Sequence, residues 1–158
     1  MIARKQIRFD DRAALRQLIS EQYGEFGSSL KLSQEKVDAF GKLTGDEQWI
    51  HSDVERAQRE SPFGTTIAHG FLVLSVINVL EDATDFEIVG HRTVINYGAD
   101  KLRFIRPVPV GARIKKRSRL AHVRQKGPGG TQLTVDTEIW VEGGSEPAVF
   151  YKAIVLFL

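Results

Sequence analysis

The sequence of 158 residues contains no cysteine. This absence excludes disulfide bonds, thiolate-bound metals and a cysteine nucleophile. An excess of charge of one sign is also missing, because 22 basic residues stand against 20 acidic ones, for a net charge of +2. A surface that binds nucleic acid needs a strong basic excess, so a nucleic-acid partner is not expected.

Long apolar runs are missing as well. The longest apolar stretch, residues 66–80, is shorter than the ~20 residues that cross a membrane, and residues 1–11 are polar rather than a signal-peptide core. We expect a soluble, cytoplasmic protein, which the lack of cysteine also suits. Hydrophobic residues make up 42% and charged residues 27%, which suits a single domain over residues 1–158.

Three segments are predicted to be helical. Residues 10–21 carry apolar side chains at helical spacing, and residues 33–44 begin with a serine N-cap and end near a glycine. Residues 65–80 are apolar on almost every side, and a helix that is apolar all round is a buried helix. Residues 46–59 are polar and mixed, and their first part is not predicted as helix.

Strand-like runs follow the third helix. The clearest alternates between apolar and polar side chains over residues 132–141, which predicts a half-buried strand. The Gly-Pro-Gly-Gly turn of residues 127–130 joins it to the preceding run as an antiparallel hairpin. A buried helix needs a sheet wrapped around it, so the predicted fold class is α+β. The predicted strands cover residues 86–96, 102–105, 113–123, 132–141 and 148–158.

Asp46 and His51 are the first candidates for chemistry. Their spacing turns an α-helix by about 500°, so the two side chains would not share a helix face. They converge only where the chain is irregular, and Gly45 permits such a conformation directly before the acid. A carboxylate and an imidazole that converge can hold one water between them, and either group can then act as general base.

Gly70 lies near the start of the predicted buried helix. Backbone N–H groups at a helix start have no partner within the helix and favour negative charge. With no side chain in the way, this N–H suits an oxyanion, such as a thioester carbonyl that becomes an enolate. Adding water to a 2-enoyl thioester needs a base, a proton for C2 and a stabilised carbonyl oxygen, and the sequence offers a candidate for each.

Structural roles for the same residues are also open. An acid and an unrelated histidine often share this spacing on a surface, and Gly70 would suit close packing of a helix on a sheet. His69 is expected to cap the helix or to bond to a backbone group. A zinc site formed by Asp46, His51 and His69 is not expected, because their spacing matches no known zinc motif.

Two blocks of sequence resemble the MaoC-like family of R-specific enoyl-CoA hydratases and dehydratases. They are residues 43–53 (Leu-Thr-Gly-Asp-Glu-Gln-Trp-Ile-His-Ser-Asp) and residues 62–71 (Pro-Phe-Gly-Thr-Thr-Ile-Ala-His-Gly-Phe). Residues 48–51, 95–98 and 103–111 are similar to the NodN-like branch of that family. The resemblance implies a hot-dog fold, in which a curved antiparallel sheet wraps a long buried central helix. It also implies a homodimer with active sites near the subunit interface.

The resemblance also implies roles for single residues. Asp46 and His51 would hold and activate the catalytic water, and the backbone N–H of Gly70 would contact the thioester carbonyl. Gln48 stands where many relatives have an asparagine that helps to position the substrate. Asn78 stands where many carry a small hydroxyl residue in the central helix. These two departures from the family pattern bear on the range of substrates.

The predicted function is a hydro-lyase that acts on 2-enoyl and 3-hydroxyacyl thioesters of coenzyme A or, as a second choice, of acyl carrier protein. No metal or redox cofactor is implied, because coenzyme A would be part of the substrate. One alternative is a hot-dog thioesterase, but those enzymes usually place an acid on or near the central helix, and residues 65–80 contain none. The other is a non-catalytic protein that binds acyl thioesters, against which the pair Asp46 and His51 argues.

A row of basic residues alternates along the predicted strand 113–123 and therefore shares one face. Such a row would attract the phosphates of coenzyme A or of a carrier-protein arm. We favour a solvated face whose charges pair with Asp136 and Glu138 across the hairpin. The row consists of Arg113, Lys115, Arg117 and Arg119.

Overall fold

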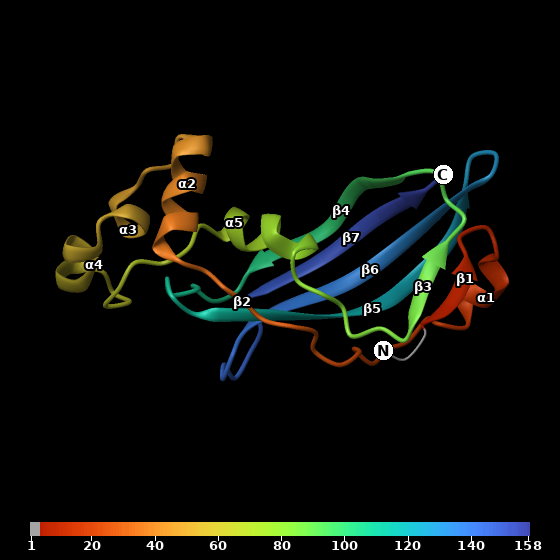
Figure 1. Ribbon diagram of the computed structural model, residues 1–158, viewed down its shortest axis with the longest axis horizontal. Coiled ribbons are helices and arrows are strands. Elements are labelled where there is room, and N and C mark those ends of the chain that lie inside the picture. The colour runs from red at the N-terminus through yellow and green to blue at the C-terminus, as the bar shows by residue number, and fades with distance from the viewer. Residues whose placement is uncertain (1–3) are drawn as a thin grey trace.

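The computed structural model describes residues 4–158, which form an antiparallel sheet with helices beyond one end and a small second sheet at the other (Figure 1). The five strands of the large sheet run in the order β2-β5-β6-β7-β4, and every pair is antiparallel. The predicted α+β class and its antiparallel sheet are therefore confirmed. The strands are β2 (Leu30–Lys31), β4 (Val94–Phe104), β5 (Arg113–Lys126), β6 (Gly130–Val141) and β7 (Val149–Phe157).

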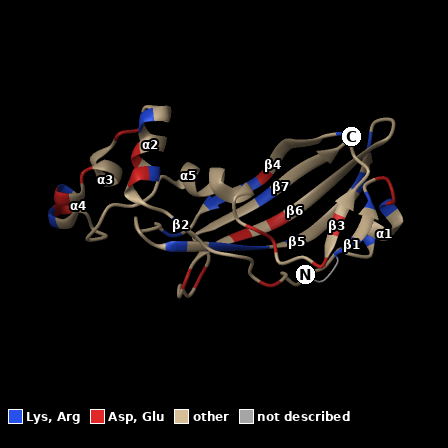
Figure 2. Ribbon diagram, viewed as in Figure 1, with Lys and Arg blue, Asp and Glu red and all other residues tan. Residues whose placement is uncertain are grey.

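The hairpin of β5 and β6 forms at the predicted glycine-rich turn. Its register pairs Arg117 with Glu138 and Arg119 with Asp136, and the side chains form ion pairs at 2.8 and 2.7 Å. Figure 2 shows basic residues of β5 beside acidic residues of β6. Arg117 and Arg119 are therefore paired across the hairpin with the acids we expected, Arg113 pairs instead with Glu142 at 3.5 Å, and Lys115 lies over the ring of Phe26.

Most of the polar face of β6 is buried, which differs from the predicted half-buried strand, although Glu138 and Trp140 are partly exposed. Gln132, Thr134 and Asp136 are each less than one tenth exposed. Arginine side chains from β5 reach across them, because Arg119 donates to Asp136 and Arg124 donates to Gln132. Long side chains that lie along a strand cover its polar face, and an alternating pattern alone does not reveal such a cover.

The outer edge of β5 is covered by the chain that precedes α2. The short strand β2 pairs with one part of this edge. Elsewhere along the edge, the backbone N–H groups of Ser20, Gly24 and Gly27 donate to carbonyls of β5. The opposite edge of the sheet is β4, in which all residues but one are exposed. The sheet thus has one closed edge and one open edge.

The N-terminal half supplies most of the helices. The helix predicted for residues 33–44 is confirmed, with Ser33 as its N-cap and Gly45, at φ 78°, as its C-cap. The first helix is shorter than the predicted residues 10–21, and a strand that no pattern predicts precedes it. The elements are β1 (Lys5–Arg8), α1 (Arg12–Arg16), α2 (Gln34–Thr44), α3 (Trp49–Ser52) and α4 (Val54–Glu60).

The prediction of one buried helix over residues 65–80 is wrong in length. Only α5 (Gly70–Ser75) and the 3₁₀ turn η1 (Val76–Asn78) are helical. The preceding residues run extended, because Ala68 N–H donates to the carbonyl of Val108 and Thr66 accepts from the N–H of Val110. Within residues 4–158, every helix is too short or too polar to cross a membrane.

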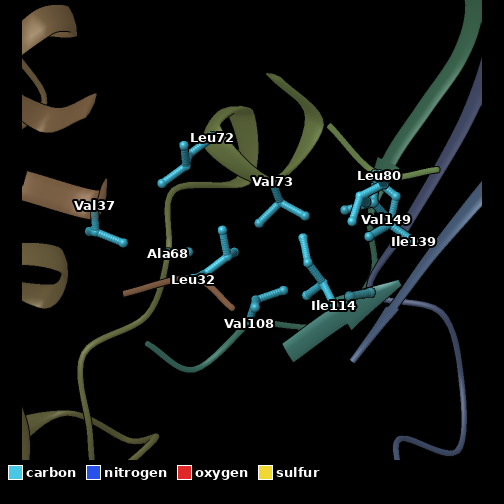
Figure 3. Packing of buried hydrophobic residues seen from close by; sticks show 11 residues of the cluster. Leu32, Val37, Ala68, Leu72, Val73, Leu80, Val108, Ile114, Ile139 and Val149 are labelled. Atoms are coloured by element: carbon cyan, nitrogen blue, oxygen red, sulfur yellow. The ribbon is translucent and has the colours of Figure 1, made fainter. Parts of the chain in front are cut away.

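The same segment is also less buried than predicted. Phe71 and Val79 are each 61% exposed, so only one side of α5 and η1 faces the core. That side packs on the sheet around Val73, as Figure 3 shows. The long buried central helix is therefore absent from residues 4–158, although a helix still packs against the antiparallel sheet. The core cluster at this end of the sheet comprises Leu32, Val37, Ala68, Leu72, Val73, Leu80, Val108, Ile114, Ile139, Ala148 and Val149.

A second sheet of two parallel strands, β1 and β3 (Phe86–Val89), lies at the end of the molecule away from α2 (Figure 1). The strand predicted over residues 86–96 is thus two strands, because the chain turns at Gly90, where φ is 82°. Residues of both sheets line a cavity of about 520 Å³ that includes none of the predicted site residues.

Candidate active site

Asp46 and His51 come together because the chain between them is irregular, as predicted. α2 ends at Gly45 in the left-handed conformation, and α3 begins only at Trp49. Asp46 is exposed and His51 is partly buried. A carboxylate oxygen of Asp46 lies within 4.8 Å of a ring nitrogen of His51. No direct hydrogen bond joins them among the described residues, and one bridging water would span such a gap.

The ring of His51 is held by a backbone carbonyl. Its Nδ1 lies 2.7 Å from the carbonyl oxygen of Ile67. Because a carbonyl only accepts, Nδ1 carries the proton of the neutral ring and Nε2 keeps its lone pair. Ile67 is fixed in turn, since its N–H donates to the carbonyl of Ile50. Nε2 is therefore the basic nitrogen of His51.

His69 lies against His51. It is 4% exposed, and the two rings stack with their centroids 3.9 Å apart and their planes at 29°. Its Nε2 donates to the backbone oxygen of Asp46 at 2.8 Å. The expected bond to a backbone group is confirmed, whereas the side chain makes no capping bond to α5. Among residues 4–158, Nδ1 of His69 has no hydrogen-bond partner.

The cluster of Asp46, His51 and His69 is compact enough to suggest a metal site, but the two rings are not oriented for one. Histidine binds a metal through a lone pair in the plane of its ring, at about 2.0–2.1 Å for zinc. Two stacked rings direct these lone pairs along nearly parallel planes. They would meet at one ion only if a ring rotated, so the geometry supports a catalytic or structural role for the cluster.

Two cavities meet at His51. One of about 50 Å³ lies among Asp46, His51 and His69 and has room for one or two waters. The other, of about 360 Å³, has His51 and Gly70 in its wall and falls in the size range of ligand pockets. Its remaining lining is mainly apolar and consists of Ile67, Ala68, Phe71, Val73, Phe104, Ile105, Arg106, Pro107, Val108 and Val149.

Gly70 is the first residue of α5, so its N–H has no acceptor within the helix. A Cβ at this position would lie 2.8 Å from the ring of Phe104, so glycine lets that ring close against the start of the helix. α5 has only 6 residues, and its dipole is smaller than that of the long helix we predicted. The candidate oxyanion donor is therefore the N–H itself, in the wall of the larger cavity.

Gln48 and Asn78 are exposed and line neither cavity. Gln48 precedes α3, where its carbonyl accepts from the hydroxyl of Ser52. Asn78 is the last residue of η1. A single chain thus does not bring these two residues to the cluster, and the substrate-positioning roles implied for them stay predictions.

Gln34 belongs to the framework of the site, although no motif marks it. Its Nε2 donates to the backbone oxygen of His51 at 2.6 Å and to Asp38 at 2.8 Å, and its Oε1 accepts from Thr66 at 2.8 Å. The side chain therefore ties α2 both to α3 and to the extended segment before α5. Its partners are distant in sequence, so spacing could not identify it.

Comparison with known sequences gives a match to a family model and matches to several relatives. The MaoC like domain model matches residues 18–142. The chain is 41% identical over 150 residues to 3-hydroxyacyl-thioester dehydratase Z of Mycobacterium tuberculosis, which covers 95% of this chain and 97% of that protein. It is 36% identical over 127 residues to Nodulation protein N of Rhizobium leguminosarum bv. viciae, with 79% of each covered.

Among solved structures, the (R)-hydratase from A. caviae involved in PHA biosynthesis is similar in fold. It shares 27% sequence identity with a TM-score of 0.66, over 86% of this chain and 96% of that chain. The five-stranded antiparallel sheet with a packed helix thus has the arrangement of a known hydratase structure.

Proposed function

The chain belongs to the family of MaoC-like domains, and on this basis we propose that it is a hydro-lyase that interconverts 2-enoyl and 3-hydroxyacyl thioesters. The resemblances to MaoC-like and NodN-like proteins that the motifs indicated are confirmed by the comparisons. The observation that carries the proposal is the position of His51, which lines both the water-sized cavity and the apolar cavity. Hydration of an enoyl thioester needs these two spaces, one for the water and one for the acyl chain.

In the hydration direction, one water lies between the carboxylate of Asp46 and Nε2 of His51. Nε2 accepts a proton as the water oxygen bonds to C3, while Asp46 accepts the second hydrogen bond of the water and orients it. The π electrons of the C2–C3 bond move toward the thioester carbonyl, and the N–H of Gly70 donates to the enolate oxygen. His51 then returns the proton to C2. Dehydration runs through the same steps in reverse.

The proposal includes a homodimer that forms along β4, the open edge of the sheet. An exposed edge with apolar side chains favours strand pairing with another chain. Phe71 of α5 packs edge-on against Phe104 at 5.3 Å, so the exposed side of α5 continues the surface of β4. Both rings also line the larger cavity, and a second copy would therefore lie beside the acyl site. The exposed apolar residues of β4 are Val94, Ile95, Tyr97 and Phe104.

The activity is tested with crotonyl-CoA by following the absorbance of the conjugated enoyl group. Hydration bleaches this absorbance, a thioesterase would release a free thiol, and a binding protein would do neither. Asp46→Asn and His51→Ala are each expected to lower kcat/KM by about 100-fold or more, because a missing acid–base group costs about 10²–10⁴-fold.

Two matched variants serve as controls. Asp53 is the exposed N-cap of α4, a position that asparagine fills equally well, so Asp53→Asn should keep the wild-type rate. His122 is exposed on β5, so His122→Ala should do the same. Full activity in either site variant would overturn the assignment of Asp46 and His51. Thiol release without hydration would overturn the reaction.

A further inference from the structure

His69 is buried at the centre of the cluster, and the reaction above gives it no step. Its ring stacks on His51 at 3.9 Å and is tilted against Phe40 at 5.2 Å. Among residues 4–158, its Nδ1 is buried without a hydrogen-bond partner, and such an atom loses its bonds to water at a cost in stability. An apolar side chain would avoid this cost, so the reason for a histidine here lies in its other contacts.

One contact of His69 concerns the backbone of Asp46. Asp46 is exposed and stands between α2 and α3, so helix geometry does not fix its position. Nε2 of His69 donates to its carbonyl oxygen at 2.8 Å. α2 packs on the same oxygen, since a Cβ at Gly41 would lie 2.9 Å from it. The hydrogen bond from His69 therefore anchors the one residue of the pair that lies outside regular structure.

The other contact concerns the ring of His51. The bond from Nδ1 to Ile67 fixes one nitrogen of that ring, but a ring held at one atom can still tilt. The face of His69, stacked at 29°, restricts this tilt. Together the bond and the stack set the direction in which Nε2 of His51 points.

We infer that His69 is a positioning residue, which holds the backbone of Asp46 through its Nε2 donor and the ring plane of His51 through its face. This inference rests on the proposed function, because it assigns His69 an effect on the pair that handles the water. His69 carries no proton in the reaction.

Three substitutions separate the two contacts. His69→Phe keeps a ring for the stack and removes the donor, His69→Gln keeps an N–H donor and removes the ring, and His69→Leu removes both. With crotonyl-CoA we expect kcat to fall by about 10-fold for Phe and Gln and by about 100-fold for Leu. KM should change by less than about twofold, because a misplacement of about 1 Å slows the chemical step without weakening binding.

Action through His51 is tested in the His51→Ala background. There His69→Leu should reduce the residual rate by less than about twofold, because residues that act as a unit are not additive. A merely structural role would lower the thermal midpoint and would reduce activity equally in both backgrounds.

Wild-type kcat in His69→Leu would overturn the inference, as would a rise in KM at unchanged kcat, or full additivity with His51→Ala. Should His69→Leu fail to fold, the comparison rests on the Phe and Gln variants, and wild-type kcat in both would count against positioning. Failure of the proposed function is a separate result, because it appears as a wild-type protein that does not hydrate crotonyl-CoA.

Discussion

At the scale of single residues, the site depends on Gly41, where α2 approaches the backbone of Asp46 so closely that no side chain fits between them. Gly41 lies inside α2, where alanine would ordinarily be favoured by about 0.5–1 kcal/mol. A Cβ there would lie 2.9 Å from the backbone oxygen of Asp46 and 3.5 Å from Cε1 of His69. We therefore expect Gly41→Ala to lower kcat by about 10-fold or more, since the backbone of Asp46 must move.

Steady-state kinetics with crotonyl-CoA measure this effect. Lys36→Ala, at an exposed position of the same helix, is the control and should turn over at the wild-type rate. If Gly41→Ala did the same, Asp46 would not need its present backbone position.

Part of the site could be predicted from the sequence. Gly45 allows a local turn, and this turn is what brings Asp46 toward His51. The contacts of Gln34 and His69 could not be predicted, because they depend on how α2, α3 and the segment before α5 pack together. The periodicity and spacing of residues in the sequence do not indicate such packing.

At the scale of elements, the β5–β6 hairpin carries a ladder of charges against which Tyr23 packs. The guanidinium of Arg117 lies 5.1 Å from the centre of the Tyr23 ring. Burial raises the pKa of Tyr23 above its ordinary value of 10.0, and the carboxylates of Glu138 and Asp136 raise this pKa further. A group whose pKa is raised in the folded state contributes stability at pH values below its ordinary pKa. This contribution is lost as the pH rises through the folded-state pKa.

Ultraviolet titration of the phenolate measures this pKa directly. The difference between wild type and Tyr23→Phe isolates one of the three tyrosines, and its midpoint should lie above that of free tyrosine. The free energy of unfolding should fall more steeply in alkali for wild type than for Tyr23→Phe. A midpoint at or below that of free tyrosine would contradict the burial of Tyr23 near the charges of Glu138 and Asp136.

Elements with local signals were predictable, and those fixed by distant contacts were not. Ser33 and Gly45 cap α2, and the glycine-rich turn sets the β5–β6 register, so both follow from neighbouring residues. Residues 66–68 are extended because they pair with a distant segment, which overrides their helix-like apolar pattern. β1 is short, and Ile7 is its one buried side chain, so no alternation marks it.

At the scale of the whole molecule, β4 and the exposed side of α5 and η1 predict a dimer. Ile95→Lys on β4 and Val79→Lys after η1 would each place an unpaired charge in the interface, which is costly to bury. Both variants should sediment as monomers at concentrations where the wild type is dimeric. Leu43→Lys is the control, because Leu43 is 83% exposed but lies on α2, and it should stay dimeric. A monomeric wild type would contradict the interface.

The covered edge of β5 limits how far such an assembly can grow. Backbone donors from residues 20–27 already occupy its carbonyls, so a neighbouring copy can add its strand on the β4 side alone. A two-fold pair joins the β4 edges of its two copies, so within residues 4–158 the five-stranded sheet has no second open edge for a third molecule. The fold thereby allows pairing while it blocks the end-to-end polymerisation that a sheet open on both sides would invite.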